Sequence, residues 1–360
     1  MKGAQNNITE PVLAILVNSL ESGGAEKQSV YLLNVLKDKY KTLFFIFHGD
    51  LIDEKIFRLI EGDNYVLVQL RGNFFLKLVN LYRVLKDNNV KVFFTYLTKP
   101  NFWGSIIGSL AGVKKIYGGI RSTNLPIWKL ILEKITMHFL STGTIFNSYL
   151  AEEIFSKGLK AKHSIVIPNC LPFISNASIR TPKECLTIIS VGRFHEAKDY
   201  KTAINAINLL VKKELKIYYQ IIGYGHLESS IRKWITELHL NESIELIINP
   251  SNIIELLEKA DIYLSTSKYE GTSNSIMEAM NSSLPIVATN VGDNNKLIFE
   301  GKSGYLHDVG DFKSIADRLQ FLIQNYEARI NMGIKSNEIL RENYSSKQFR
   351  DRYFKLIQTK

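Results

Sequence analysis

Two glutamates stand eight residues apart in the segment SKYEGTSNSIMEAMNSS, which covers residues 267–283. Glu270 lies in a loop of small polar residues, and Glu278 lies about five residues, or roughly 7 Å, into a helix predicted to begin at Ser273. The free N–H groups at a helix start favour an anion, whereas carboxylates beside that anion accept hydrogen bonds from neutral hydroxyls. The spacing therefore predicts a diphosphate between two hydroxylated groups. The alternative is that Glu278 only interacts favourably with the helix dipole and that Glu270 is solvated.

Two cations follow a predicted strand in the segment VGRFHEAKDY. Arg193 and Lys198 are five residues apart in this loop. Cations at a strand end can neutralise a diphosphate, and an arginine can do so through two parallel hydrogen bonds. A solvated charge pair is the alternative interpretation.

Paired glycines occur in two further loops. Gly23 and Gly24, in NSLESGGAEK, separate a predicted strand from its helix, and glycine there permits close approach of a phosphate or an acceptor. An ordinary strand–helix turn explains them equally well. Gly223 and Gly225, in IIGYG, lack a third glycine at dinucleotide spacing, so they are a weak signal for a dinucleotide cofactor.

Short apolar runs must position these loops, and they alternate with amphipathic stretches along the chain. The runs are continuously apolar, which is typical of parallel strands covered on both faces, and strand–helix alternation predicts an α/β fold. Helices are expected over Ala25–Asp38 and Phe74–Asp87. The predicted strands are Val12–Val17, Thr42–Phe47, Tyr65–Leu70, Val90–Tyr96, Lys114–Ile120 and Thr142–Asn147, and in the second half CLTIISVG, IYYQIIG, IELII, DIYLSTS and LPIVATN.

A proline-containing stretch without periodicity, Ile167–Glu184, divides the two series of strands. We therefore predict two doubly wound parallel-sheet domains, 1–172 and 173–345, followed by a C-terminal helix over 346–360 that packs toward the first domain through Phe349, Tyr353 and Leu356. Ligands of such sheets bind at the carboxyl ends of the strands, so the cleft between the domains is the expected site.

Composition restricts the class of protein. The 360 residues are 45% hydrophobic and 22% charged, without an apolar run long enough to cross a bilayer and without a secretory signal. Cys170 and Cys185 form no disulfide framework or metal-ligand spacing, so we expect free thiols in the cytosol. The net charge is +10, and residues 1–172 carry 21 basic against 13 acidic side chains. This excess favours an anionic partner such as a membrane surface, and a scattered solvated charge remains the alternative.

The segment EGTSNSIMEAM resembles the E-x7-E motif of the family 4 retaining glycosyltransferases, also called group 1 glycosyltransferases. Further segments are similar to that family's motifs in the same order: SGGAEK, IFNSYLAEEIFSKGL, IVIPN, VGRFHEAKD, IIGYG, ADIYLSTSKYEG, and LPIVATNVG with IFEGKSGYL. The resemblance covers nearly the whole chain and implies a GT-B fold, two Rossmann-like domains facing a central cleft. It also implies sugar transfer from a nucleoside-diphosphate sugar, with retention at the anomeric carbon and without a metal or other cofactor.

The same resemblance assigns roles to individual residues. Glu270 would bind hydroxyls of the donor sugar and Glu278 those of the ribose, while Arg193 and Lys198 stabilise the departing diphosphate. The resemblance thus implies Arg193, Lys198 and Glu270 as catalytic residues. The rest of the expected donor-binding set is Gly23, Gly24, Gly223, Gly271, Thr272, Ser273, Asn274, Ser275 and Ile276.

Three positions depart from the family pattern. Arg121, in YGGIRST, stands where many members have a histidine, and we interpret it as a contact to acceptor or donor phosphate. Asn169–Cys170 replaces a usual Asn-Gly. The segment GDNNK supplies Asp293 and Lys296 in place of a glycine and a glutamate, which leaves the donor sugar and base open.

The sequence therefore predicts a hexosyltransferase of surface-glycan biosynthesis (capsule, lipopolysaccharide or a related polysaccharide). It would act on a lipid-linked or polysaccharide acceptor at the inner face of the plasma membrane. The basic first domain and aromatics such as Phe102, Trp103 and Trp128 would touch anionic lipid, although core packing explains the aromatics as well. The alternatives are a nucleotide-sugar epimerase or phosphorylase on the same scaffold, and a non-catalytic nucleotide-sugar-binding subunit. No recognition helix or RNA-stacking motif supports a nucleic-acid partner.

Overall fold

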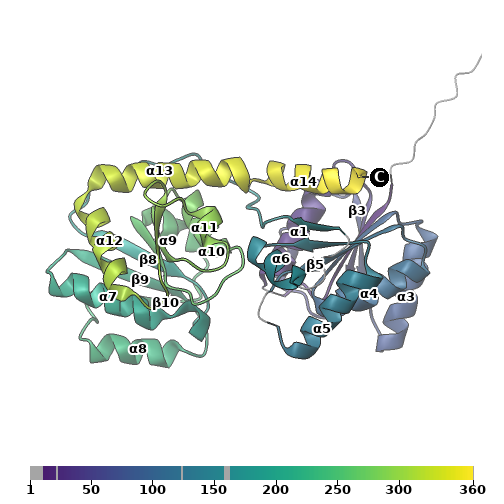
Figure 1. The fold of residues 1–360 in the computed structure, drawn as a ribbon, viewed down its shortest axis with the longest axis horizontal. Helices are drawn as coiled ribbons and strands as arrows, with labels where there is room; N and C mark the ends of the chain where they lie inside the picture. The colour runs from purple at the N-terminus through teal and green to yellow at the C-terminus, as the bar shows by residue number, and fades with distance from the viewer. Residues whose placement is uncertain (1–10, 22, 123–124, 158–162, 360) are drawn as a thin grey trace, which may run out of the picture. The chain divides into compact units, whose positions relative to one another are not determined.

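The computed structural model describes residues 11–21, 23–122, 125–157 and 163–359, and these form two compact units (Figure 1). The first unit contains residues up to Cys170 together with Ser346 onward, and the second contains Leu171–Ser345. The motif residues Ser22, Thr123 and Gly158–Leu159 lie outside the described residues.

The first unit is built on a seven-stranded sheet in the order β3-β2-β1-β4-β5-β6-β7, with every neighbouring pair parallel. The inner strands are buried along their length because helices cover both faces of the sheet. The strands are β1 (Leu13–Val17), β2 (Thr42–Ile46), β3 (Tyr65–Gln69), β4 (Val92–Tyr96), β5 (Lys115–Ile120), β6 (Gly143–Phe146) and β7 (Ser164–Val166).

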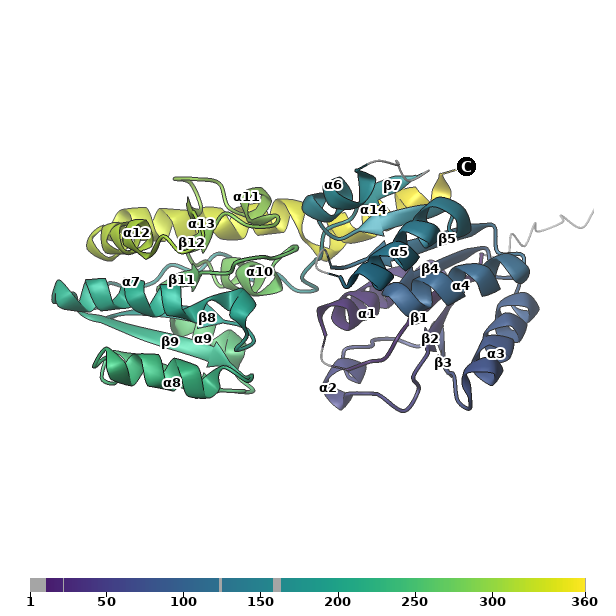
Figure 2. The same ribbon diagram turned by 60° about the horizontal axis from the view of Figure 1, so that its bottom comes forward.

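Helices α1 and α14 cover one face of this sheet, and α3 and α4 cover the other. Helix α4 packs against both α3 and α5, so these three helices form one layer (Figures 1 and 2). Gly104 and Gly108 let α4 lie close to the sheet, since an added Cβ would fall 2.7 Å from Thr95 and 2.9 Å from Phe93. The helices are α1 (Gly24–Leu36), α2 (Glu54–Phe57), α3 (Phe74–Asp87), α4 (Thr98–Leu110), α5 (Ile127–Ile135), the π-helical η1 (Thr136–Leu140), α6 (Tyr149–Ser156) and α14 (Ser346–Gln358).

The second unit repeats the design with a six-stranded parallel sheet in the order β10-β9-β8-β11-β12-β13. Its strands are β8 (Leu186–Val191), β9 (Ile217–Gly223), β10 (Ile244–Ile248), β11 (Ile262–Ser265), β12 (Ile286–Thr289) and β13 (Gly304–His307). Its helices are the 3-10 turn η2 (Glu196–Lys198), α7 (Tyr200–Lys212), α8 (Glu228–Glu237), α9 (Ile253–Lys259), α10 (Asn274–Asn281), α11 (Asn294–Leu297), α12 (Phe312–Gln324) and α13 (Tyr326–Asn343).

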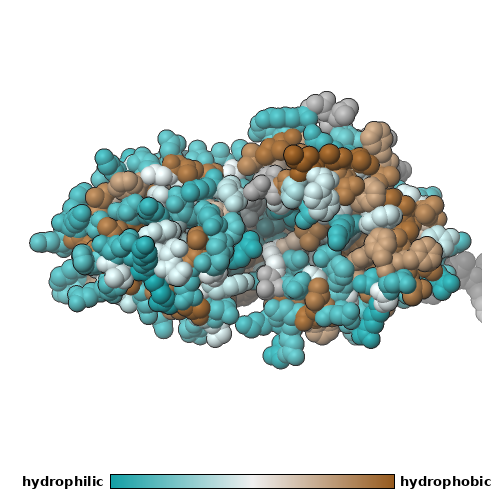
Figure 3. Space-filling model, turned by 90° about the horizontal axis from the view of Figure 1, so that it is seen from below, coloured by the Kyte–Doolittle hydropathy of each residue, from teal (hydrophilic) through white to brown (hydrophobic). Residues whose placement is uncertain are grey.

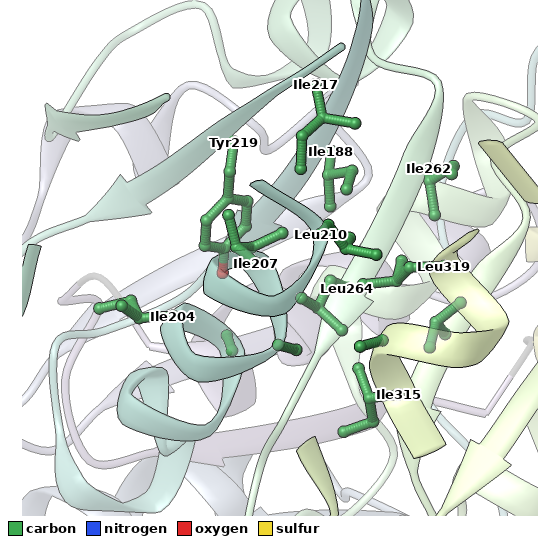
Figure 4. Close-up of a cluster of buried hydrophobic side chains, with 14 of the residues drawn as sticks. Ile188, Ile204, Ile207, Leu210, Ile217, Tyr219, Ile262, Leu264, Ile315 and Leu319 are labelled. Atoms are coloured by element: carbon green, nitrogen blue, oxygen red, sulfur yellow. The ribbon is translucent and has the colours of Figure 1, made fainter. Parts of the chain in front are cut away.

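The cores of the second unit lie on both faces of its sheet. Figure 4 shows one of them, in which Ile204 and Ile207 of α7 and Ile315 and Leu319 of α12 meet Leu264 of β11. On the other face, apolar residues of α9, α10 and α13 pack together. Helix α10 is therefore fixed by its buried side, which leaves its partly exposed side at a defined position.

The proline-containing stretch is bound to the second unit along much of its length. The guanidinium of Arg180 is buried and donates to the backbone carbonyls of Ala260, Ser282 and Ser283. Ser175 accepts at its carbonyl from Asn337. The chain passes between the units at Cys170–Leu171 and again at Ser345–Ser346.

The predicted fold class is confirmed: both halves are parallel α/β sheets, and the predicted strands are present with ends that shift by one or two residues. The short strand β7 and strand β13 were not predicted as strands. The C-terminal helix α14 buries Phe349 and Tyr353, with Leu356 half-buried.

Candidate functional site

The carboxyl ends of β8 and β11 define the candidate site in the second unit. These strands are neighbours, and the strand order runs outward from them in opposite directions, from β8 to β9 and from β11 to β12. Loops after two such strands diverge and leave a crevice where ligands of doubly wound sheets bind. The loop after β8 holds Arg193 and Lys198, and the loop after β11 holds Glu270.

An ion pair joins the two loops. The Nζ of Lys198 donates to Oε1 of Glu270 at 2.5 Å, and the hydroxyl of Ser267 donates to the same oxygen at 2.7 Å. The side chains of Lys198 and Glu270 are 22% and 14% exposed, so the pair is shielded yet reachable from solvent. The second carboxylate oxygen, Oε2, has no hydrogen bond to the residues that the structure describes.

Backbone contacts hold these loops in register. The hydroxyl of Thr266 donates to the carbonyls of Lys198 and Asp199, each at 3.0 Å, and the amide of Lys268 donates to the carbonyl of Ala197 at 2.7 Å. Asp199 adopts a left-handed conformation (φ 45°) that turns the chain from η2 into α7. The position of the ammonium group is therefore set by the fold, which favours a preorganised site.

Buried tyrosines form the floor beneath the pair. A small recess at the strand ends is lined by Ser190, Lys198, Tyr200, Tyr263, Thr266 and Ser267. The hydroxyl of Tyr200 donates to the carbonyl of Gly192 at 2.9 Å, and that of Tyr263 donates to the carbonyl of Val191 at 3.3 Å. Burial raises the pKa of both phenols, so both stay neutral and act as donors.

Helix α10 presents a polar face beside this recess. Asn274, Ser275 and Glu278 are partly exposed, whereas Ile276 and Met277 are buried in the core. Ile276 can therefore contribute only its backbone to a ligand. Ser273 occupies the N-cap position, and its side chain does not cap the helix. The sequence-predicted residues Thr272 and Ser273 are buried just before this helix start.

The loop around Glu270 is braced by the segment that departs from the family pattern. Gly292 has a φ of +57°, and a Cβ there would lie 2.4 Å from the carbonyl oxygen of Glu270. The amide of Asp293 donates to the carbonyl of Gly271 at 3.2 Å, and the carboxylate of Asp293 accepts from the hydroxyl of Thr272 at 3.3 Å. Asp293 is thus buried support for the loop, whereas Lys296 is exposed.

Two further predicted site residues lie outside this braced loop: Gly223 packs against neighbouring backbone, and Arg193 is exposed. A Cβ at Gly223 would lie 1.9 Å from the carbonyl oxygen of Gly192, so close backbone packing alone requires glycine there. The side chain of Arg193 is exposed, and no ion pair involves it within the described residues. It lies in the same loop as Lys198, with its guanidinium in solvent.

In the first unit, Gly23 caps helix α1 and Gly24 begins it. The carboxylate of Glu26 folds back onto this turn, since a Cβ at Gly23 would lie 1.9 Å from its Oε2. Burial raises the pKa of Glu26, and Glu21 adds to the rise. A neutral hydroxyl is a better partner here than a phosphate, because a second anion would be repelled. Sequence reasoning missed Glu26, since a first-turn glutamate is ordinary at a helix start.

Arg121 follows β5 at the carboxyl edge of the first sheet. Its guanidinium carbon lies 4.6 Å from the ring centroid of Tyr96, and its Nη1 donates to the side chain of Asn169 at 3.1 Å. Its Nε and Nη2 are buried without a hydrogen-bond partner among the described residues. Cys170 is buried beside this site, and burial raises the pKa of its thiol to about 12, which leaves it unreactive.

Residues 174–338, nearly all of the second unit, match the family model described as glycosyl transferases group 1. The second unit thus matches the group 1 glycosyl transferases over nearly its whole length. This confirms the resemblance on which the roles of Glu270 and Lys198 rest, although the roles themselves stay predictions.

Curated relatives match this chain over different extents. It is 27% identical over 166 residues to N-acetyl-alpha-D-glucosaminyl L-malate synthase of Bacillus anthracis, which is 46% of this chain and 43% of that protein. It is 24% identical over 354 residues (88% of this chain, 91% of that protein) to a second relative, from Campylobacter jejuni. That protein is the N-acetylgalactosamine-N,N'-diacetylbacillosaminyl-diphospho-undecaprenol 4-alpha-N-acetylgalactosaminyltransferase. The chain spans about half the length of the first curated relatives that it matches.

Among solved structures, HepE from Anabaena in complex with UDP superposes with a TM-score of 0.83 at 16% identity, over 96% of this chain and 99% of that protein. The same protein has been crystallised with UDP-glucose. The likeness establishes the GT-B fold for this chain.

Proposed function

We propose that this chain is a retaining glycosyltransferase that moves a sugar from a nucleoside-diphosphate donor to a lipid-linked or polysaccharide acceptor. The observation that carries the proposal is the pair of Lys198 and Glu270 at the crevice between β8 and β11. A cation and a carboxylate there, next to the start of α10, match the alternation of charge and hydroxyls in a nucleotide sugar.

The donor would bind along the loops of the second unit. The diphosphate lies over the start of α10, where backbone N–H groups, Lys198 and Arg193 neutralise it. The free oxygen of Glu270 accepts from hydroxyls of the sugar, and Glu278 accepts from hydroxyls of the ribose. The complexes of HepE with UDP and UDP-glucose support a uridine nucleotide as the first donor to test.

Transfer would use the leaving group itself as the base. The bond between the anomeric carbon and the diphosphate oxygen breaks, and charge develops on that oxygen where Lys198 and Arg193 stabilise it. The acceptor oxygen attacks from the same face, and its proton passes to a phosphate oxygen. The new glycosidic bond keeps the anomeric configuration, and these protein cations take the place of a metal.

The acceptor would bind to the first unit. Arg121 brings unpaired N–H groups to the carboxyl edge of that sheet, which suits an anionic acceptor group. The Campylobacter relative is named for a diphospho-undecaprenol acceptor, which supports a lipid-linked substrate. Within the described part of the chain, no helix is both long and apolar enough to span a bilayer. We infer peripheral contact with an anionic membrane at its cytoplasmic face, in a surface-glycan pathway.

A thermal-shift titration with UDP, GDP and their glucose, galactose and N-acetylglucosamine conjugates tests the donor site, because ligands that bind only the folded protein raise its Tm. We expect one nucleotide to raise Tm in the wild-type protein and Glu278→Ala to weaken that response. Arg193→Ala should chiefly lower the turnover rate, measured as nucleoside diphosphate formed from the donor. Unchanged behaviour in both variants would refute the site.

A donor-only incubation separates transfer from epimerisation. An epimerase would convert the nucleotide sugar without an acceptor, whereas a transferase leaves it intact apart from slow hydrolysis. A binding subunit would show the Tm shift with no turnover under any acceptor.

A further inference from the structure

The helical segment formed by α5 and η1 exposes its large apolar side chains. Their exposed fractions are high for residues of this type, and we call the group the α5 stripe: Ile127 (77%), Trp128 (51%), Ile131 (52%), Ile135 (37%) and Phe139 (78%). Residues 127, 131, 135 and 139 recur every four positions, so they fall along one side of the segment.

A carboxylate is buried on the inward side of this segment. Glu133 is only 3% exposed and accepts hydrogen bonds from the side-chain amide of Asn101 at 3.2 and 3.0 Å. An ordinary surface helix buries its apolar side and exposes its charges. This segment instead buries Glu133 and Thr136 beside Met137 and exposes five large apolar side chains, and exposed apolar surface of this kind marks an interaction site.

Further apolar side chains are exposed on another helix of the same layer. Helix α4 packs between α3 and α5, and α3 begins with three exposed apolar residues, Phe74 (47%), Phe75 (72%) and Leu76 (49%). In Figure 1, α5 lies at the lower side of the first unit, and the view from below in Figure 3 shows apolar side chains gathered over that unit. The apolar surface is therefore broader than one helix.

The charges of this layer are almost all positive. Asp87 and the buried Glu133 are the acidic residues of α3, α4, α5 and η1. Against them stand six basic residues: Lys77, Arg83, Lys86, Lys99, Lys129 and Lys134. The ammonium of Lys129 lies over the ring of Trp128 at 5.4 Å, so a cation is held beside the stripe.

We propose that the α5 stripe is a membrane-docking surface that inserts into the headgroup region of a bilayer rich in anionic lipid. Apolar side chains flanked by lysines and a tryptophan are the combination that binds such interfaces. A second copy of this chain is a poorer occupant, because a chain with a net charge of +10 would bring two basic layers together. This proposal rests on the proposed function, because an enzyme with a lipid-linked acceptor must bring its first unit to a lipid surface.

The test is sedimentation with vesicles of phosphatidylcholine and phosphatidylglycerol, using the full chain without nucleotide. The stripe variant carries Ile127→Ser, Ile131→Ser and Phe139→Ser. The control variant carries the same changes at three exposed residues of the second unit, Ile254→Ser (65%), Ile179→Ser (70%) and Phe173→Ser (74%). We expect the stripe variant to lose about 10-fold or more in partition coefficient and the control to bind like the wild type.

A charge variant, Lys129→Gln with Lys134→Gln, should weaken binding to the anionic vesicles and reduce its dependence on salt. Equal binding by the wild type and the stripe variant would overturn the proposal. So would a wild type that self-associates in analytical ultracentrifugation while the stripe variant is a monomer and neither binds vesicles. The Tm response to nucleotides, measured on each variant, checks folding and reports separately on the donor site. If no nucleotide raised the Tm of the wild type, the proposed function would be refuted, whereas the docking result would stand.

Discussion

The two sheets have the same strand order near their centres, yet the charged groups at their carboxyl edges are held differently. In the second unit the ammonium of Lys198 is paired with Glu270, and Ser267 supports the same carboxylate. In the first unit Arg121 keeps two buried guanidinium nitrogens, Nε and Nη2, without a partner among the described residues, and Glu26 lies against Gly23. The ion pair at the second edge is formed before any ligand arrives, whereas two guanidinium nitrogens at the first edge have no partner among the described residues. Under the proposed function, we therefore expect a preorganised donor site and an acceptor site that is completed by its ligand.

Breaking the satisfied edge should have the largest effect. Lys198→Met removes the cation that would face the departing diphosphate and leaves Glu270 without its ion-pair partner. We therefore expect the turnover rate, measured as nucleoside diphosphate formed from the donor, to fall by about 100-fold or more. Steady-state kinetics with the best donor found by thermal shift would measure this. The double variant with Glu270→Gln should lose much less than the sum of the two single variants, because the residues act together. Additive losses would show that they act separately.

The contrast between arginines gives the next effect. Arg180 in the second unit donates to three backbone carbonyls from a buried position, so Arg180→Met should lower the free energy of unfolding by about 3 kcal/mol or more. Arg121→Met removes a guanidinium in which two nitrogens have no hydrogen-bond partner among the described residues, and it should change stability by about 1 kcal/mol or less. Urea denaturation would compare them. Equal losses would mean that Arg121 is structural, and the acceptor role would then have no support from its unpaired groups.

Glycine substitutions can separate bracing of the Glu270 loop from simple backbone strain. Gly292→Ala combines a left-handed φ of +57° with a Cβ that lies 2.4 Å from the carbonyl oxygen of Glu270. Gly301→Ala has a φ of +70° and no atom within 4 Å of the added Cβ, so it carries the strain alone, about 1 kcal/mol. We expect Gly292→Ala to be less stable than the control and to show slower nucleotide release. A control with the same kinetic loss would argue against specific bracing.

The smallest effect concerns the pH dependence of stability. Burial raises the pKa of Glu26, so the folded state binds this proton more tightly than the unfolded chain does. The contribution of Glu26 is therefore most favourable below the ordinary glutamate pKa of about 4.3, and it declines as the pH rises from there through the raised folded value. Glu26→Gln should gain stability relative to the wild type over the same rise. Thermal unfolding at several pH values would show this, and a pH-independent difference would contradict it.

The sequence predicted the second unit's site better than the first unit's surface. Glu270, Lys198 and the start of α10 follow strands whose apolar runs are unambiguous, so their common edge could be inferred from parallel topology. The bracing contact of Gly292 with Glu270 could not, because it joins two loops that are separated by helix α10 and strand β12. The packing role of Gly223 was also invisible, since it depends on the backbone of Gly192.

The orientation of α5 could not be inferred either. A periodic pattern of Ile127, Ile131 and Ile135 normally indicates the buried side of a helix. Here the buried position belongs to Glu133, because Asn101 of α4 supplies the hydrogen bonds that make its burial possible. Only the tertiary partner reveals which side of such a helix faces the solvent.

Helix α14 has a consequence for how the protein is made. Its residues Phe349, Tyr353 and Ile357 complete the core of the first unit, and the hydroxyls of Tyr353 and Tyr96 lie 2.8 Å apart. During synthesis, the ribosome must finish the entire second unit before this helix emerges. The earliest part of the chain thus waits, with apolar residues of α1 and β4 uncovered, for a segment translated about 320 residues after α1 and about 250 after β4. Such long waiting periods are when chaperones bind nascent chains.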